Sequence, residues 1–92
     1  MSVCLRLLAL LADRIDGVSS VAVPARTVRD ALRALTTRYP ELRALVLGKN
    51  GTINQMMVVF LNNKQLSSGQ LASSVGDGDE IEIIPAIEGG SP

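Results

Sequence analysis

The sequence predicts an α+β domain, in which a mixed sheet of roughly four to five strands packs one face against one main helix. Apolar residues alternate along several short segments, and a single longer segment has helical spacing. The segments follow in the order strand, strand, helix, strand, short strand, strand. The 92 residues are enough for one domain, and a hydrophobic share of 47% lets it form a core without a metal or a disulfide.

Two strands are predicted near the N-terminus. From Val3 to Leu7 every second side chain is a branched aliphatic one, which is the period of a strand with one buried face. Asp16 and Gly17 form a turn signal ahead of a valine-rich strand over residues 19–23, so we expect the chain to open with a hairpin. The apolar stretch 3–12 carries an arginine and is too short to cross a bilayer, so we interpret it as a core strand and its exit.

Thr27 begins the main predicted helix. The segment from Thr27 to Asp30 resembles a capping box, with aspartate in place of the usual glutamate or glutamine. Apolar side chains then recur on one helical face at Val28, Ala31, Leu32 and Leu35. Tyr39 precedes Pro40, and a residue before proline disfavours the helical backbone, so the helix is predicted to end there. Residues 41–47 predict a short second helical turn.

Three more strands are predicted in the second half of the chain. Residues 55–61 form the strongest of them. Asn62 and Asn63 suit a tight turn into a short returning strand over residues 64–66, because asparagine tolerates the left-handed backbone of hairpin turns. An irregular stretch and a turn of glycine and aspartate lead to the final strand, residues 80–85.

Charge and residue content exclude several classes of function. Nine basic and nine acidic residues cancel, which leaves no broad electropositive field for a nucleic acid. The sequence has no histidine, which excludes His-dependent triads and His-ligated zinc, and no carboxylate pair is placed for acid–base work. Cys4 is expected to be a packing residue, and Asp77 and Asp79 lack the pattern of a calcium loop. We expect a cytoplasmic protein with no catalytic residue, bound cofactor, metal site or membrane partner.

Three segments near the C-terminus point to a known family. Residues 59–63 (VFLNN) run from an apolar strand into an asparagine turn, residues 77–80 (DGDE) form a turn, and residues 83–90 (IIPAIEGG) end in Gly-Gly. Together they resemble the ubiquitin-like β-grasp sulfur carriers, the family of MoaD, ThiS and CysO, and the order of elements agrees over the whole chain. The stretch 67–78 and the ending IPAI are most similar to the cysteine-synthesis carriers of CysO type.

The resemblance implies a carrier whose last glycine is the site of chemistry. In the family, an E1-like adenylyltransferase and sulfurtransferase uses ATP to adenylate the terminal carboxylate. Sulfur then replaces AMP, and the resulting thiocarboxylate serves a sulfur-accepting biosynthetic enzyme. On this chain the adenylated residue is Gly90, and Gly89, Glu88 and Ile87 are the residues by which the tail is recognised. A glycine end lacks the β-carbon that would clash in a narrow channel. Two alternatives stay open: a modifier joined through Gly90 to lysines of other proteins, and a non-covalent interaction module with an inert tail.

The tail departs from the family in one respect. We expect residues 1–85 to form the domain and residues 86–92 a flexible tail, in which Ser91 and Pro92 hold Gly90 in an amide bond. If these two residues are native, a protease must remove them before activation, and the resemblance implies a JAMM-type metalloprotease. If they are an addition to the natural chain, no protease is implied. The sequence leaves the biosynthetic pathway and the oligomeric state open.

Strand alternation predicts a docking surface on the face of the sheet that points away from the helix. Leu8, Phe60 and Ile84 are expected there on neighbouring strands, where the resemblance to ubiquitin-like proteins implies an apolar docking patch. Phe60 is the only phenylalanine and the expected anchor, because aromatic residues are enriched at binding hot spots. The alternative is that the three are scattered surface apolar residues, which are common.

Overall fold

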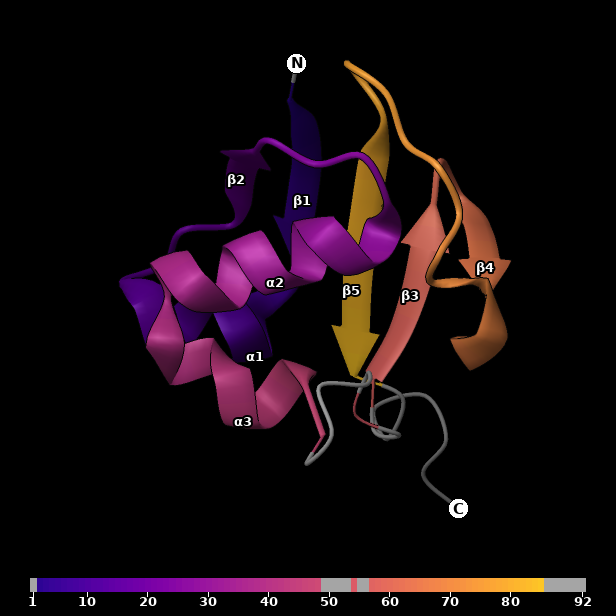
Figure 1. Ribbon diagram of the computed structural model, residues 1–92. Coiled ribbons are helices and arrows are strands. Elements are labelled where there is room, and N and C mark those ends of the chain that lie inside the picture. Colours follow the sequence, from indigo (N-terminus) through magenta and orange to yellow (C-terminus); the bar gives the residue numbers. More distant parts are fainter. Residues whose placement is uncertain (1, 49–53, 55–56, 86–92) are drawn as a thin grey trace.

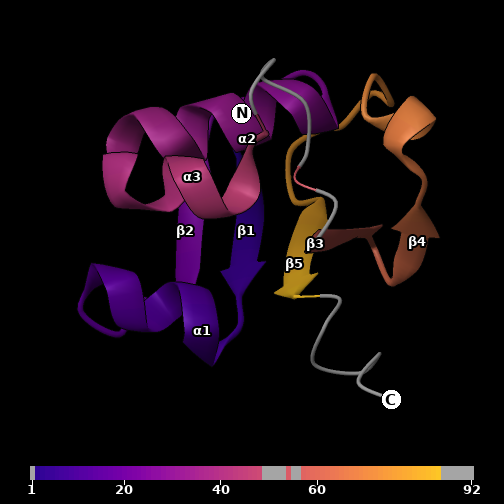
Figure 2. The ribbon, with the colours of Figure 1, turned by 90° about the horizontal axis from the view of Figure 1, so that it is seen from below.

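A computed structural model describes residues 2–48, 54 and 57–85. The described part of the chain forms one five-stranded sheet in the order β2-β1-β5-β3-β4, with the main helix α2 (Val28–Arg38) across one face (Figures 1 and 2). The strands are β1 (Val3–Leu7), β2 (Ser20–Val23), β3 (Met57–Leu61), β4 (Lys64–Leu66) and β5 (Glu80–Pro85). Shorter helical segments are α1 (Ala9–Ala12), η1 (Asp13–Ile15), η2 (Pro40–Leu42), α3 (Arg43–Val46) and η3 (Ser68–Gln70). A mixed sheet with one main helix confirms the predicted fold class.

The last strand occupies the centre of the sheet. β5 pairs in parallel with β1 and antiparallel with β3, so both of its edges are hydrogen-bonded to neighbours. Its buried side chains, Ile81, Ile83 and Pro85, point into the core. β5 is therefore held on two sides as far as Ile83, and by β3 alone over the last two residues before the predicted tail.

The two faces of the sheet differ as the alternation predicted. Val3, Leu5 and Leu7 on β1 are buried, whereas Arg6 between them is exposed. The buried face packs on α2 through the four apolar residues predicted for it: Val28, Ala31, Leu32 and Leu35. On the other face the described side chains of the strands are exposed or half-buried. The buried core is aliphatic, as the low aromatic content requires.

The signals at both ends of α2 are confirmed. The Thr27 hydroxyl oxygen accepts a hydrogen bond from the Asp30 backbone N–H at 3.1 Å, which satisfies one of the free donors at a helix start. Tyr39 ends the helix ahead of Pro40, and its N–H donates to the Leu35 carbonyl at 2.8 Å. η2 and α3 then form the short second helical segment that was predicted for residues 41–47.

The predicted opening hairpin is wrong in its connection, although β1 and β2 do pair antiparallel. The chain between them forms α1 and η1 instead of a tight turn. Leu11, Ala12 and Ile15 are buried in this segment, so a helical turn places apolar side chains at one end of the core. Asp16 and Gly17, with φ of 60° and 81°, act as the stop after η1 and reverse the chain toward β2.

A hydrogen-bond network explains the Asp-Gly-Asp turn before β5. Asn62 and Asn63 adopt the left-handed backbone predicted for them, with φ of 50° and 71°. The Asn62 side-chain oxygen accepts from the Glu80 N–H at 2.9 Å, and its amide nitrogen donates to Asp79 at 3.2 Å. Asp79 also accepts from the Gly76 N–H at 2.8 Å, and these bonds hold the pKa of its carboxyl below the ordinary value.

We predict that Asp79→Asn lowers the melting temperature at neutral pH. A lowered folded-state pKa means that the carboxylate stabilises the fold above the ordinary aspartate pKa of about 3.9. This contribution is lost as the pH falls through the lowered pKa, so the two proteins should converge in acid. Thermal unfolding followed by circular dichroism at several pH values measures the difference in melting temperature, with Asp16→Asn as an exposed control. A constant difference at all pH values contradicts the assignment.

Candidate functional site

β5 ends at one end of the sheet, in its centre. Its last residue, Pro85, pairs with Met57 of β3, at the end of the sheet opposite the N-terminus (Figure 1). The predicted activation residue Gly90, and the tail-recognition residues Gly89, Glu88 and Ile87, lie outside the described residues. A chain of five residues spans at most about 17 Å, so an enzyme that acts on Gly90 must approach within that distance of Pro85.

The three predicted docking residues lie on the face of the sheet away from α2. Leu8 is 37% exposed. Phe60 on β3 and Ile84 on β5 are half-buried. Leu8 directly follows Leu7, which pairs with Ile83, so Leu8 extends the row of Ile84 on the adjacent strand. Phe60 and Ile84 therefore lie on neighbouring strands, as predicted, whereas Leu8 lies one residue beyond the end of β1.

Val58 is a fourth member of this surface, and sequence reasoning did not select it. It is half-buried and pairs with Ile84, on the same face as Phe60. Alternation along β3 was a sufficient signal, but only the register showed that Val58 fills the space between the predicted residues. We call Leu8, Val58, Phe60 and Ile84 the sheet-face patch. It lies beside the last described residue before the tail.

Polar and charged side chains border the sheet-face patch on one side. A shallow hollow of about 360 Å³ is lined there by residues of β1, β2 and β5, among them Arg6, Leu8 and Glu82. Arg6 Nη1 lies 3.7 Å from Glu80 Oε1, and both side chains are more than half exposed. Ion pairs with this exposure contribute little to stability. The Cys4 sulfur lies 3.1 Å from the Ser20 hydroxyl, and Cys4 is half-buried on this face and not part of the buried core.

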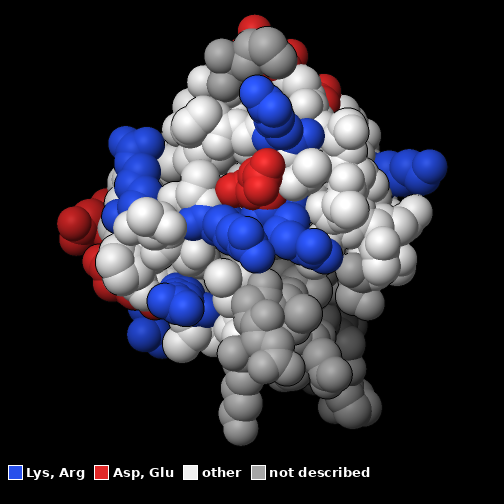
Figure 3. Space-filling view, in the orientation of Figure 1, with Lys and Arg blue, Asp and Glu red and all other residues white. Residues whose placement is uncertain are grey.

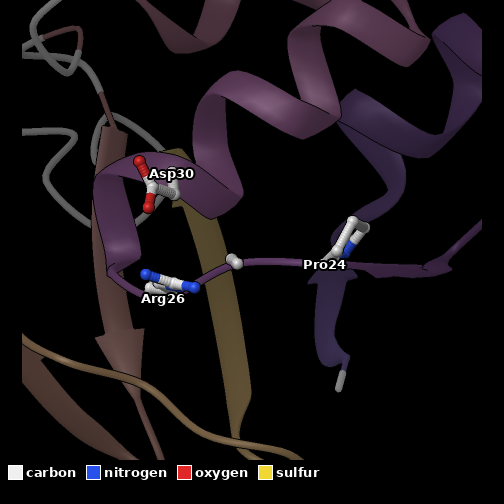
Figure 4. A pocket seen from close by; sticks show the side chains of 4 residues that line it. Pro24, Arg26 and Asp30 are labelled. Carbon is white, nitrogen blue, oxygen red and sulfur yellow. The ribbon is translucent and has the colours of Figure 1, made fainter.

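A second hollow, of about 600 Å³, lies at the start of α2. Figure 4 shows Arg26 on the loop into the helix and Asp30 on its first turn, with Pro24 farther along the loop. The first backbone N–H groups of α2 already have partners. The Val28 and Arg29 N–H groups donate to the carbonyls of Ser73 and Leu71, and the next N–H donates to the Thr27 hydroxyl oxygen. Because these donors are used within the fold, the hollow lacks the free N–H groups of a helix-terminal anion site.

Basic side chains gather on the helix side of the molecule. Figure 3 shows a band of them across the middle of this face, beside an acidic residue. Arg29 and Arg33 are exposed one helical turn apart on α2. No helix in the described part of the chain is long and apolar enough to cross a membrane. The same residues contain no group of three His, Cys, Asp or Glu placed to hold a metal ion.

The family follows from a comparison with known proteins. The profile of the ThiS family matches residues 7–90, a range that contains β5 and extends through the Gly-Gly pair. The chain belongs to the ThiS family. This membership agrees with the resemblance carried by VFLNN, DGDE and IIPAIEGG, and it extends that resemblance over nearly the whole chain.

Individual relatives of this ThiS-family chain include carriers and a modifier. The sulfur carrier protein CysO of Mycobacterium tuberculosis is 25% identical over 93 residues, covering 98% of this chain and 100% of CysO. Small archaeal modifier protein 1 of Haloferax volcanii is 33% identical over 64 residues, which is 70% of each protein.

Solved structures confirm that this ThiS-family chain has the ubiquitin-like β-grasp fold. The crystal structure of the Haloferax volcanii modifier matches with a TM-score of 0.81 and 31% identity, over 92% of this chain and 94% of that one. A chain in the crystal structure of the Amycolatopsis orientalis BexX/CysO complex matches with a TM-score of 0.80 and 26% identity, over 91% and 94%. That complex shows a relative bound to a partner protein.

Proposed function

We propose that this protein is a sulfur carrier, itself not an enzyme, whose Gly90 carboxylate is activated by an E1-like adenylyltransferase and sulfurtransferase. The observation that carries the proposal is the ThiS-family match, which extends to Gly90. The CysO relative, aligned over its whole length, supports a cysteine-type pathway before molybdopterin or another product. The carrier binds no cofactor of its own, and the activating enzyme uses ATP.

The proposed chemistry takes place on the last carbonyl carbon. The Gly90 carboxylate oxygen attacks the α-phosphorus of ATP, which forms an acyl-adenylate and releases pyrophosphate. A sulfur donor then displaces AMP, and the C–S bond of a thiocarboxylate replaces the C–O bond to AMP. The carrier contributes a rigid body and a tail end without side chains, so its part in catalysis is to hold the carboxylate in position. The thiocarboxylate passes its sulfur to an accepting biosynthetic enzyme.

The fold is consistent with a folded body that docks on the enzyme and a tail end that reacts. β5 pairs with β1 as far as Ile83 and with β3 as far as Pro85, and the sheet-face patch lies beside that point. An enzyme that covers Leu8, Phe60 and Ile84 is therefore adjacent to the origin of the tail. Ile87, Glu88 and Gly89 are the segment that would enter the enzyme's channel. In this proposal, docking on the patch places Gly90 at the site of adenylation.

In the given sequence, activation requires removal of Ser91 and Pro92, because an amide carbonyl has no free carboxylate to attack ATP. If the two residues are native, a metalloprotease of JAMM type is the proposed processing enzyme. The bond to be cleaved then joins Gly90 to Ser91.

The test is activation of a chain that ends at Gly90. Incubation with the E1-like enzyme, ATP and a sulfide donor should raise the intact mass by the difference between one sulfur and one oxygen. Fragmentation should place the change at Gly90. The matched control is the chain that retains Ser91 and Pro92, which should keep its mass. An unchanged mass for the trimmed chain, with an enzyme shown to activate another carrier, would falsify the proposal.

A second function is supported by the modifier relative. Small archaeal modifier protein 1 is similar both in sequence and in structure, so conjugation of Gly90 to lysines of other proteins is the alternative. The same acyl-adenylate serves both functions, and the difference lies in whether sulfur or an amine receives the acyl group. Higher-mass conjugates in cell extracts that disappear when Gly90 is deleted would favour the modifier.

A further inference from the structure

The face that carries the sheet-face patch also carries a carboxylate without a counterion. Glu82 on β5 is half-buried, and its partners across the strands are Arg6 on β1 and Phe60 on β3. The Arg6 guanidinium lies beside Glu80 instead, at 3.7 Å. Among the residues that the structure describes, Glu82 forms no ion pair.

The charge of this face is unbalanced. On the described strands, its charged side chains are Arg6, Glu80 and Glu82, which leaves a net negative charge. The charges of Glu80 and Arg6 offset one another at the end of β5 away from the tail, where both side chains are exposed. Glu82 lies closer to the tail, directly across from Phe60 and on the same face of β5 as Ile84. The excess charge is therefore at the border of the apolar patch.

A partner that covers the patch removes water from this carboxylate. Phe60 and Ile84 flank Glu82 on two sides, so a surface that buries both side chains also buries Glu82. An ionised carboxylate buried without a partner costs free energy that the neighbouring apolar contacts do not recover. The docking surface must therefore bring a positive charge to this position.

We infer that the docking surface of the activating enzyme presents an arginine that pairs with Glu82 and lies against the ring of Phe60. An arginine fits better than a lysine, because a planar guanidinium bonds a carboxylate through two N–H groups and stacks on an aromatic face. The inference rests on the proposed function, since it assigns the occupant of the sheet-face patch to the enzyme that acts on Gly90.

A second copy of this chain is the competing occupant. Helix α2 carries the exposed Arg29 and Arg33, which are opposite in charge to Glu82. The position of the tail favours the enzyme. Pro85 follows directly after Ile84 of the patch, and the active site must lie within about 17 Å of it. A second copy on the patch would occupy the approach to the tail.

The experiment measures binding of the chain ending at Gly90 to the E1-like enzyme by calorimetry. Glu82→Gln should weaken binding about tenfold and Glu82→Lys about a hundredfold, as interfacial charge pairs do. Glu41→Lys is the matched control, since it makes the same change of charge at an exposed residue on η2, and it should stay within about twofold. The glutamine variant should also lose much of the salt dependence of binding.

A charge swap identifies the partner residue. Exposed arginines of the enzyme are replaced by glutamate one at a time, and one such variant should bind the Glu82→Arg chain more tightly than the unchanged chain. If no variant does so, or if Glu82→Lys binds as Glu41→Lys does, the inference is overturned. Conversion of Gly90 to the thiocarboxylate at saturating carrier is measured separately, so that failure of docking through Glu82 is distinguished from failure of the proposed function.

Two further measurements test whether Arg6 or a second copy of the chain pairs with Glu82. If Arg6 moves to Glu82 on docking, Arg6→Gln should weaken binding as much as Glu82→Gln, and this result would overturn the inference in favour of pairing within the carrier. Binding that is unchanged or tighter in Arg6→Gln supports it. Sedimentation of the carrier alone tests the second copy: dimers that Glu82→Lys disrupts would also overturn the assignment to the enzyme.

Discussion

Replacing Phe60 by aspartate is expected to reduce activation of Gly90 by roughly 30-fold or more, because a central aromatic anchor is replaced by a charge that must be desolvated. Phe60 is half-buried on the face away from α2, so the substitution leaves the buried core intact. It also adds a second carboxylate directly across from Glu82. The measurement is kcat/KM for thiocarboxylate formation with the chain that ends at Gly90.

The control for this prediction is Thr37→Asp, which introduces the same charge at an exposed position of α2. It should activate as the unchanged chain does. Gly90→Ala separates the tail from the docking surface, because it alters the reacting end while the patch stays complete. If Phe60→Asp abolishes biological activity and Gly90→Ala has no effect, the protein is a non-covalent interaction module and the carrier proposal fails.

Replacing Ile81 by alanine is expected to lower the free energy of unfolding by about 2–4 kcal/mol, which combines lost apolar transfer with the cavity left behind. Ile81 is fully buried in the central strand, between β1 and β3. A small domain has only about 5–15 kcal/mol of stability, so the loss is a large share of the total. Urea denaturation followed by circular dichroism gives the difference.

Ile84→Ala is the matched control, because it makes the same change on the same strand but on the half-buried face. Ile84→Ala should lower the free energy of unfolding by less than half as much as Ile81→Ala. Less apolar area is buried at this position, and solvent or a rotamer change fills the space. Equal losses for the two variants would contradict the assignment of the faces of β5.

Local features of the fold and the site were predictable wherever a few neighbouring residues decide the backbone. Thr27 and Pro40 bound α2 because a cap and a proline act within one turn of the helix. Asn62 and Asn63 make the turn into β4 because they tolerate positive φ. Alternation also placed Leu8, Phe60 and Ile84 on one face, since a strand has a period of two whatever it pairs with.

The connection between β1 and β2 was not predictable in the same way. An apolar stretch that continues beyond Leu7 is compatible with a longer strand, an exit or a helix. The helical choice depends on the open end of the core, which Leu11 and Ile15 fill. That end of the core is formed by segments distant in the sequence, so no local pattern predicts the helical connection.

The sequence by itself determined the class of the fold, the ends of the main helix, the face of each strand and the Gly-Gly end on which the proposed function rests, because each depends on neighbours within a few residues. Only the tertiary structure decided that β5 lies between β1 and β3, that Val58 completes the sheet-face patch, and that Glu82 lies beside Phe60 with no ion pair to any residue that the structure describes. These features depend on strand register, which is set by hydrogen bonds and packing between residues far apart in the chain.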